Sequence, residues 1–90
     1  MELIFREEDG KFVAEFTATS DFNLHLERKD KGSLALYQTG SQSGQYVEAY
    51  VVSGMLGEKV IDTDFGALVY PKYIKVVSGS KVNIATVTFA

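Results

Sequence analysis

His25 is the one histidine of a chain without cysteine, so few side chains could carry out covalent or metal chemistry. It alternates with Leu24 and Leu26 in a segment typical of a half-buried strand, which predicts a solvent-facing ring. A catalytic histidine needs a nucleophile or a substrate cleft beside it, and no Gly-x-Ser-x-Gly motif is present. We therefore expect His25 to be an ordinary surface residue.

The segment Asp62–Gly66 places two carboxylates two residues apart before a glycine, as the start of a calcium loop can. The EF-hand spacing is absent, because Gly66 stands at the fifth position and Tyr73 at the twelfth, where a glutamate is required. Asp-Phe-Gly also occurs in protein kinases, but their other motifs are missing here. A tight acidic turn is the favoured interpretation, and no metal ligand is predicted.

The consecutive acidic residues Glu7, Glu8 and Asp9 lie at the tip of a predicted hairpin. Glycoside hydrolysis requires two carboxyl groups facing each other across a cleft of about 5–10 Å, and consecutive residues on a turn do not provide this arrangement. No glycine-rich loop precedes a predicted helix, so a phosphate-binding site is not expected. The sequence predicts a protein that is not an enzyme, with no catalytic residue and no cofactor.

Tyrosines occupy strand positions that would otherwise face solvent. Tyr46 and Tyr50 flank Glu48, and Tyr70 and Tyr73 flank Pro71-Lys72. Tyrosine is enriched at interfaces, but in a sandwich its ring can also cover the edge of the core, and both interpretations stay open. Together with apolar residues of the last two strands, these tyrosines form a predicted protein interface: Tyr46, Tyr50, Tyr70, Tyr73, Val77, Val82 and Ile84.

Alternation of apolar and polar residues with a period of two dominates the chain and predicts strands. Asp9-Gly10 is a strong two-residue hairpin turn, which pairs Glu8 with Lys11. Continuing this register predicts two further pairs, Phe5 with Ala14 and Leu3 with Phe16.

A second hairpin is predicted from residues 22–28 and 33–39. In one register Leu26 meets Leu36 on the core face, and a slip of one residue would place Tyr37 there instead. The sequence leaves these two registers open.

The last hairpin is predicted from residues 73–77 and 82–89, and a Gly79-Ser80 turn would pair Val77 with Val82. A shift of one residue leaves neither face polar, so this register also stays open. One face is predicted to hold Ile74, Val76, Ala85, Val87 and Phe89, while Val77, Val82 and Ile84 occupy the other. A strand pair that is apolar on both sides is either central in a sandwich or covered by another chain.

Further short strands are expected at 45–52, 60–61 and 67–70, with a polar, uncharged loop at 38–45. About seven or eight short strands without a helix predict an all-β fold. The expected architecture is a small antiparallel β-sandwich or flattened barrel that forms one domain, residues 1–90.

The net charge is −3 and the pI about 5.0, which argues against nucleic acid as a partner, since phosphate binding depends on clustered Lys and Arg. No segment approaches the roughly 20 apolar residues of a membrane span. The N-terminal residues lack the features of a signal peptide, so we expect a protein made in the cytoplasm that does not act at a membrane.

Three segments resemble the compact all-β accessory proteins of tailed bacteriophages: Asp21–Glu27, Gly44–Tyr46 and Tyr70–Ile74. Those proteins decorate capsids or join fibres and tails, often as trimers or rings. The similarity extends over most of the chain but includes no diagnostic motif, so no functional residue is transferred. It implies a non-enzymatic structural component of a virion that forms a homo-oligomer or binds a larger protein scaffold.

An alternative of a different class is a module that binds carbohydrate or another small polar ligand. Its platform would consist of Tyr37, Tyr46 and Tyr50 around the 38–45 loop, because aromatic rings stack on sugars much as they do on nucleic-acid bases. The two hypotheses assign opposite environments to the same rings, since an interface buries them and a ligand platform exposes them.

Overall fold

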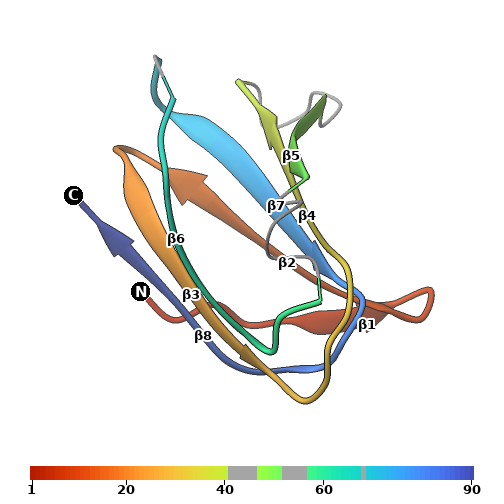
Figure 1. The fold of residues 1–90 in the computed structure, drawn as a ribbon. Helices are drawn as coiled ribbons and strands as arrows, with labels where there is room; N and C mark the ends of the chain where they lie inside the picture. The colour runs from red at the N-terminus through yellow and green to blue at the C-terminus, as the bar shows by residue number, and fades with distance from the viewer. Residues whose placement is uncertain (41–46, 52–56, 68) are drawn as a thin grey trace.

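A computed structural model describes residues 1–40, 47–51, 57–67 and 69–90, with the backbone alone at 47–51, and these residues form eight β-strands and no helix (Figure 1). The strands are β1 (Arg6–Glu8), β2 (Lys11–Ala18), β3 (Phe22–Arg28), β4 (Leu34–Thr39), β5 (Val47–Val51), β6 (Val60–Phe65), β7 (Lys72–Ser78) and β8 (Val82–Phe89). The predicted all-β fold is confirmed. In the described part of the chain no helix is long and apolar enough to cross a membrane.

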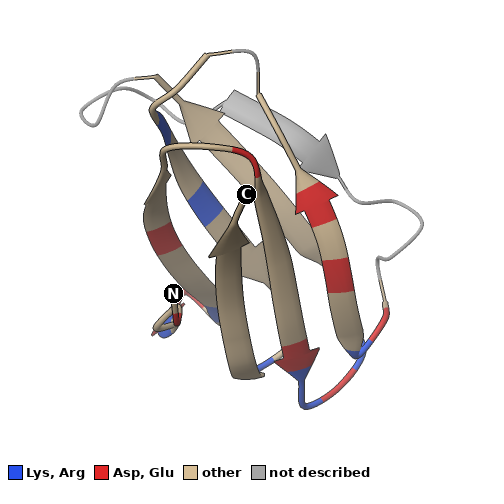
Figure 2. Cartoon of the chain, turned by 90° about the vertical axis from the view of Figure 1, so that its left-hand side faces the viewer, with Lys and Arg blue, Asp and Glu red and all other residues tan. Residues whose placement is uncertain are grey.

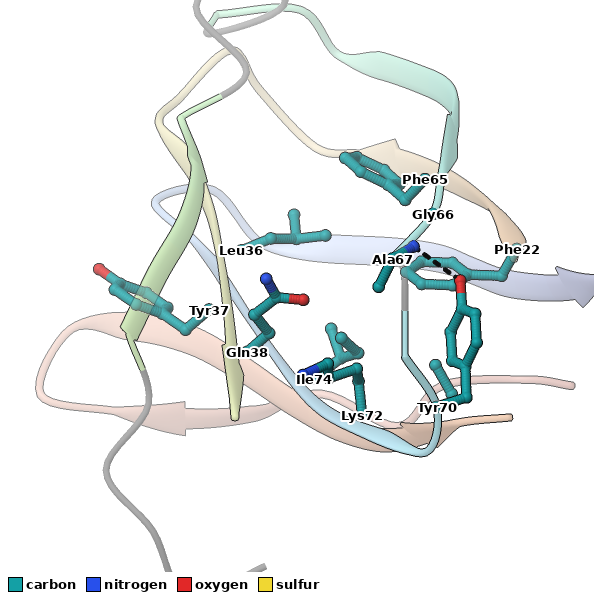
Figure 3. A pocket seen from close by; sticks show the side chains of 11 residues that line it. Phe22, Leu36, Tyr37, Gln38, Phe65, Gly66, Ala67, Tyr70, Lys72 and Ile74 are labelled. Atoms are coloured by element: carbon teal, nitrogen blue, oxygen red, sulfur yellow. Dashed lines mark hydrogen bonds between the residues drawn. The ribbon is translucent and has the colours of Figure 1, made fainter. Parts of the chain in front are cut away.

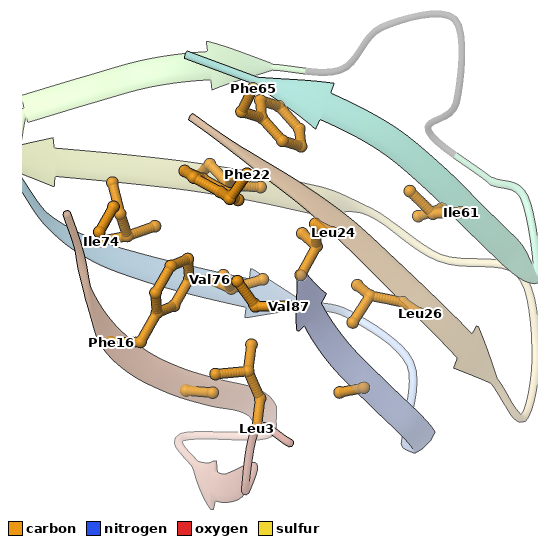
Figure 4. Packing of buried hydrophobic residues seen from close by; sticks show 14 of the residues in the cluster. Leu3, Phe16, Phe22, Leu24, Leu26, Ile61, Phe65, Ile74, Val76 and Val87 are labelled. Carbon is orange, nitrogen blue, oxygen red and sulfur yellow. The ribbon is translucent and has the colours of Figure 1, made fainter. Parts of the chain in front are cut away.

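The strands form two antiparallel sheets that pack face to face as a sandwich (Figure 1). One sheet has five strands in the order β1-β2-β7-β4-β5, and the other has three in the order β6-β3-β8. Apolar side chains at alternate positions of both sheets meet between them (Figure 4). This single core includes Phe16, Phe22, Leu24, Leu26, Leu34, Leu36, Ile61, Phe65, Ile74, Val76 and Val87.

The first hairpin forms as predicted at its turn, where Glu8 pairs with Lys11 and both Asp9 (φ 52°) and Gly10 (φ 77°) are left-handed. The ladder ends at Arg6, however, so the predicted pairs Phe5–Ala14 and Leu3–Phe16 are wrong. The preceding residues cross to the other sheet, where the amide of Leu3 donates to the carbonyl of Ala85 (3.0 Å). Leu3 still reaches the core, because the crossing points its side chain between the sheets.

The predicted second hairpin is wrong, because β3 and β4 belong to different sheets. β3 pairs with β6 and β8, so that Leu26 lies opposite Ile61 and Ala85, whereas Leu36 of β4 lies opposite Val76. Residues 29–33 therefore form an arch between the sheets. An arch satisfies the same burial pattern as a hairpin, since Leu26 and Leu36 both enter the core.

The predicted last hairpin is wrong for the same reason. β7 is central in the five-stranded sheet, where Val77 pairs with Val13 and Ala35 rather than with Val82. β8 is paired with β3 in the other sheet. The inward face was predicted correctly for Ile74, Val76, Ala85 and Val87, all of which are buried, while Phe89 is half-buried.

Residues 79–81, between β7 and β8, form a second arch between the sheets, and a buried arginine connects the two arches. Arg28 is only 3% exposed, and its guanidinium donates to the carbonyl of Ser33 (2.9 Å), to the Oγ of Ser78 (3.2 Å) and to the carbonyl of Glu58. Burial lowers the pKa of Arg28. The amide of Gly79 also donates to Ser33 (2.9 Å), so the arches are bonded directly to each other. These long-range bonds favour crossing between sheets over a local hairpin at both turns.

Two predictions about residues 60–70 are also wrong. Asp62 and Asp64 do not form a turn, because they lie within β6 and pair with β3. Residues 67, 69 and 70 do not form a strand, and the Tyr70–Pro71 peptide bond is cis. The strand predicted at 45–52 is present at Val47–Val51, whereas residues 41–46 of the predicted loop lie outside the described residues.

Candidate functional site

The residues of the predicted interface do not gather on one surface. Tyr73 and Val77 share the outer side of β7, opposite the buried Ile74 and Val76. Val82 packs against the core, and Ile84 is 48% exposed on β8 in the other sheet. Tyr46 lies outside the described residues, and Tyr50 pairs with Leu36 in β5, where only the backbone is described.

Tyr70 closes one end of the sandwich (Figure 3). Its hydroxyl donates to the carboxylate of Asp21 and accepts the amide hydrogen of Ala67 (2.8 Å). Burial and the bond to Asp21 raise the pKa of Tyr70. The ring of Tyr70 is partly buried and packs against the core. For this tyrosine the position agrees with the interpretation that the rings cover the edge of the core.

The hollow beside Tyr70 is too small for an organic ligand. Its walls are mainly apolar and include Phe22, Phe65 and Ile74, with Gln38 and Lys72 adding polar groups (Figure 3). The cavity volume is about 20 Å³, enough for a water molecule, whereas sites for small organic ligands occupy roughly 300–1,000 Å³. The side chains around this hollow therefore leave no room for an organic ligand in it.

A second, open hollow of about 560 Å³ lies at the same end. Polar groups of Asp21, Asn23, Asp64 and Thr88 line it, together with three phenylalanines, Phe22, Phe65 and Phe89. Phe22 and Phe65 are 5% and 6% exposed and stack on each other, with ring centroids 5.6 Å apart. These two rings are buried, so neither offers the open aromatic face on which a sugar stacks.

The outer face of the three-stranded sheet carries side chains in ordered rows. On β3, Leu24 and Leu26 point into the core, so the alternate residues Asn23, His25 and Glu27 point outward. β6 adds Asp64, Asp62 and Val60 beside them, and β8 adds Thr88, Thr86 and Ile84.

The N-terminal residues extend this outer face past β8. Glu2 forms a bridge with Thr86, and the amide of Leu3 donates to the carbonyl of Ala85, so the chain follows β8 as far as Leu3. The last row of the paired strands reads Val60, Glu27 and Ile84, and Ile4 is the residue after Leu3. We call these four residues the apolar row. Its three aliphatic side chains are well exposed: Ile4 is 80%, Val60 57% and Ile84 48% exposed.

A polar network occupies the row next to the apolar row. The Nε2 of His25 lies 2.8 Å from Glu27, and its Nδ1 lies 3.1 Å from Asp62. The amide nitrogen of Asn23 donates to Asp62 (2.7 Å) and to Asp64 (3.0 Å). Among the described residues no group of three or more potential ligands is arranged to hold a metal ion. The network holds these charged groups in fixed positions relative to one another.

The hydrogen bonds to Glu27 and then to Asp62 raise the pKa of His25 above 6.5. The pKa of Asp62 is lowered by its bonds to Asn23 and His25. The ion pairs of His25 therefore stabilise the fold fully at pH values below the unfolded-state pKa, and this contribution is lost as the pH rises through the higher folded-state pKa.

We expect the NMR titration of His25, the one histidine, to give a pKa above 6.5. Glu27→Gln and Asp62→Asn should each lower it, and Glu7→Gln on the distant first hairpin should not. In thermal unfolding, His25→Gln should cost more stability at about pH 5 than at about pH 8. A measured pKa at or below 6.5, or an equal loss at both pH values, would contradict the network.

Acidic groups predominate around the apolar row. Glu2, Glu27, Asp62 and Asp64 lie on this face. None of its outward residues is Lys or Arg at positions 23, 25 and 27 of β3, 60, 62 and 64 of β6, or 84, 86 and 88 of β8. Figure 2 views this sheet from outside, with the acidic residues of β6 and of the end of β3 in red. The basic residues appear at the turn below the strands and on the sheet behind.

Sequence reasoning identified Ile84 but missed Ile4 and Val60. The predicted pairing of Leu3 and Phe5 with β2 would include Ile4 in the first hairpin, whereas Glu2 and Leu3 bond to β8 instead. Val60 and Ile61 are adjacent, and alternation shows that one of them faces outward without showing which. The turn before β6 could not settle this, because its position depends on pairing with β3.

Comparison of the chain with family models, with curated proteins and with solved structures gave no match. The candidate site therefore rests on the residues themselves.

Proposed function

We propose that this chain is a non-enzymatic assembly domain that acts through protein–protein contacts, as a virion-type accessory component. The observation that carries the proposal is the apolar row. Single exposed aliphatic residues are common on proteins, but Val60 and Ile84 stand on either side of Glu27 in one register row, and Ile4 directly follows Leu3, which bonds to Ala85; each of the three is about half exposed or more. An adjacent set of this kind is typical of a surface that another protein covers.

Two other observations support contacts rather than catalysis. The apolar row stands on paired strands, which gives a binding partner a rigid surface, as interfaces with little backbone movement require. The polar residues nearest to the row, His25 and Asp62, bond to each other on an open sheet face rather than lining either of the two hollows. The resemblance of the sequence to bacteriophage accessory proteins agrees with a structural role.

Site-specific photocrosslinking in the cells that produce the protein tests this proposal. A photoreactive phenylalanine analogue at Ile84 or Ile4 should give a discrete crosslinked protein product, while the same analogue at Thr17, exposed on the outer side of β2, should not. A crosslink to a second copy of the chain or to another protein would support the proposal. Absence of a product at both row positions, or equal products at Thr17, would overturn it.

A further inference from the structure

We propose that the apolar row binds a basic protein segment, in which a Lys or Arg side chain lies between aliphatic residues. This inference rests on the proposed function and names the chemistry of the partner for the same surface. It follows from the position of Glu27 within the row and from the sign of the charges beside it.

Glu27 lies between the exposed side chains of Val60 and Ile84. A partner residue that covers both of these side chains must therefore also contact Glu27. It pairs with Val60 on one side and with Ile84 on the other. Its side chain is 45% exposed, so the carboxylate can still accept hydrogen bonds from outside the chain. The long stem of an Arg or Lys can pack on Val60 and Ile84 while its charged end reaches this carboxylate.

The charges next to the row extend the same preference. Asp62 and Glu2 lie in the adjacent row, and Asp64 lies in the row beyond it. His25 is a cation beside these carboxylates when it is protonated, and its ring is already bonded to Glu27 and Asp62. A segment with two or three basic residues therefore finds carboxylates along the direction of β3, which steers and orients binding.

Two lysines at the end of this face farthest from Asp64 set the direction of the bound segment. The amide of Lys29 donates to the carbonyl of Lys81 (2.8 Å), so two lysines are neighbours just past the apolar row. These cations repel a basic segment at the turn. Its charges are expected to extend from Glu27 toward Asp62 and Asp64, away from Lys29.

A second copy of the chain fits this surface less well. In a twofold-symmetric dimer centred on the row, both protomers use the same patch. Glu27 of one protomer would therefore face Glu27 of the other. Like charges opposed in an interface are unfavourable, and the aliphatic side chains on either side would lower the local dielectric and strengthen the repulsion. Charge complementarity therefore favours a basic partner.

Fluorescence anisotropy with synthetic peptides tests the inference on the full chain. The probe is a labelled peptide in which Ile and Val alternate with Arg, and its control has Glu in place of Arg. We expect saturable binding of the basic peptide alone, weakened tenfold or more by Glu27→Lys and by Ile84→Ser. Glu7→Lys, a change of equal charge on β1, should alter the affinity less than twofold. Raising NaCl from about 50 to about 500 mM should weaken binding, because exposed charges are screened.

A charge exchange completes the test: the Glu27→Lys, Asp62→Lys variant should bind the acidic peptide in preference to the basic one. Circular dichroism at the binding temperature establishes that each variant is folded. Equal binding of both peptides, or equal effects of Glu27→Lys and Glu7→Lys, would overturn the inference. If the crosslink at Ile84 forms while the basic peptide fails to bind, or if the crosslinked protein is a second copy, the inference fails and the proposed function stands. If no crosslink forms at the row, the proposed function fails first.

Discussion

Replacing Arg28 by Met is expected to lower the free energy of unfolding by about 3 kcal/mol or more, because it removes a buried cation with three hydrogen-bond acceptors. Arg28 donates to Ser33, Ser78 and Glu58 from a buried position. Its removal leaves these three acceptors without the cation, and each hydrogen bond to a charged group contributes roughly 1.5–3 kcal/mol. The Nε–H of Arg28 has no partner among the described residues, and its removal offsets part of the loss.

Urea denaturation monitored by circular dichroism gives the free energy directly. A 90-residue domain has about 5–13 kcal/mol in total, so the Arg28→Met variant should unfold at a much lower urea concentration. Arg28→Lys keeps the charge but loses the planar guanidinium, and one ammonium group cannot reach all three acceptors. It should therefore recover only part of the stability.

Lys29→Met is the matched control, because Lys29 is the next residue along the chain and its side chain is exposed. It should change the free energy by no more than about 0.5 kcal/mol. Equal stability of the Arg28→Met and Lys29→Met variants would show that Arg28 does not hold the two arches together.

Replacing Phe22 by Ala is expected to cost about 3–5 kcal/mol through a different mechanism, the loss of buried aromatic packing. The ring contacts Phe16 edge-on (centroids 5.1 Å apart) and stacks on Phe65 (5.6 Å), with Phe89 at 6.5 Å. Its side chain also lines the small hollow beside Tyr70, so Ala at this position would enlarge that hollow. The three surrounding rings belong to three different strands and cannot all move inward to fill the space.

Thermal and urea unfolding of the Phe22→Ala variant measure this cost, and Phe22→Leu serves as the control. Leu retains much of the buried volume and should cost less than about half as much as Ala. Binding of a small apolar molecule such as benzene by the variant, and not by the original chain, would show that the cavity persists. A loss below about 1 kcal/mol for Phe22→Ala would contradict the packing described for this end of the core.

The strands and their buried sides could be predicted from the sequence, because alternation is a local property. Leu24 and Leu26 on β3, and Ile74 and Val76 on β7, enter the core as their spacing required. Pairing could not be predicted in the same way. A glycine-containing turn of four or five residues suits a hairpin as well as an arch between sheets, and the choice depends on contacts of Arg28 with residues far away in sequence.

The candidate site shows the same limit. The outward position of Ile84 followed from its strand, but its neighbours did not, since Val60 reaches the same row, and the segment of Glu2 and Leu3 reaches β8, from distant parts of the chain. The acidic residues of the site were predicted as a turn, because Asp-Thr-Asp resembles one locally. Pairing with β3 instead extends this segment, placing Asp62 and Asp64 on one side.

The crossing of both arches has a consequence for the order in which the protein can fold. Val13 pairs with Val77 and Leu24 with Val87, so each sheet joins residues from opposite ends of the chain. Topologies dominated by such distant pairs fold in roughly milliseconds to seconds, because the ends must meet before the contacts can stabilise them. During synthesis, β2 and β3 therefore leave the ribosome well before their partners β7 and β8. Until β7 appears, the pair β1-β2 and the pair β4-β5 lack the central strand that joins them into one sheet.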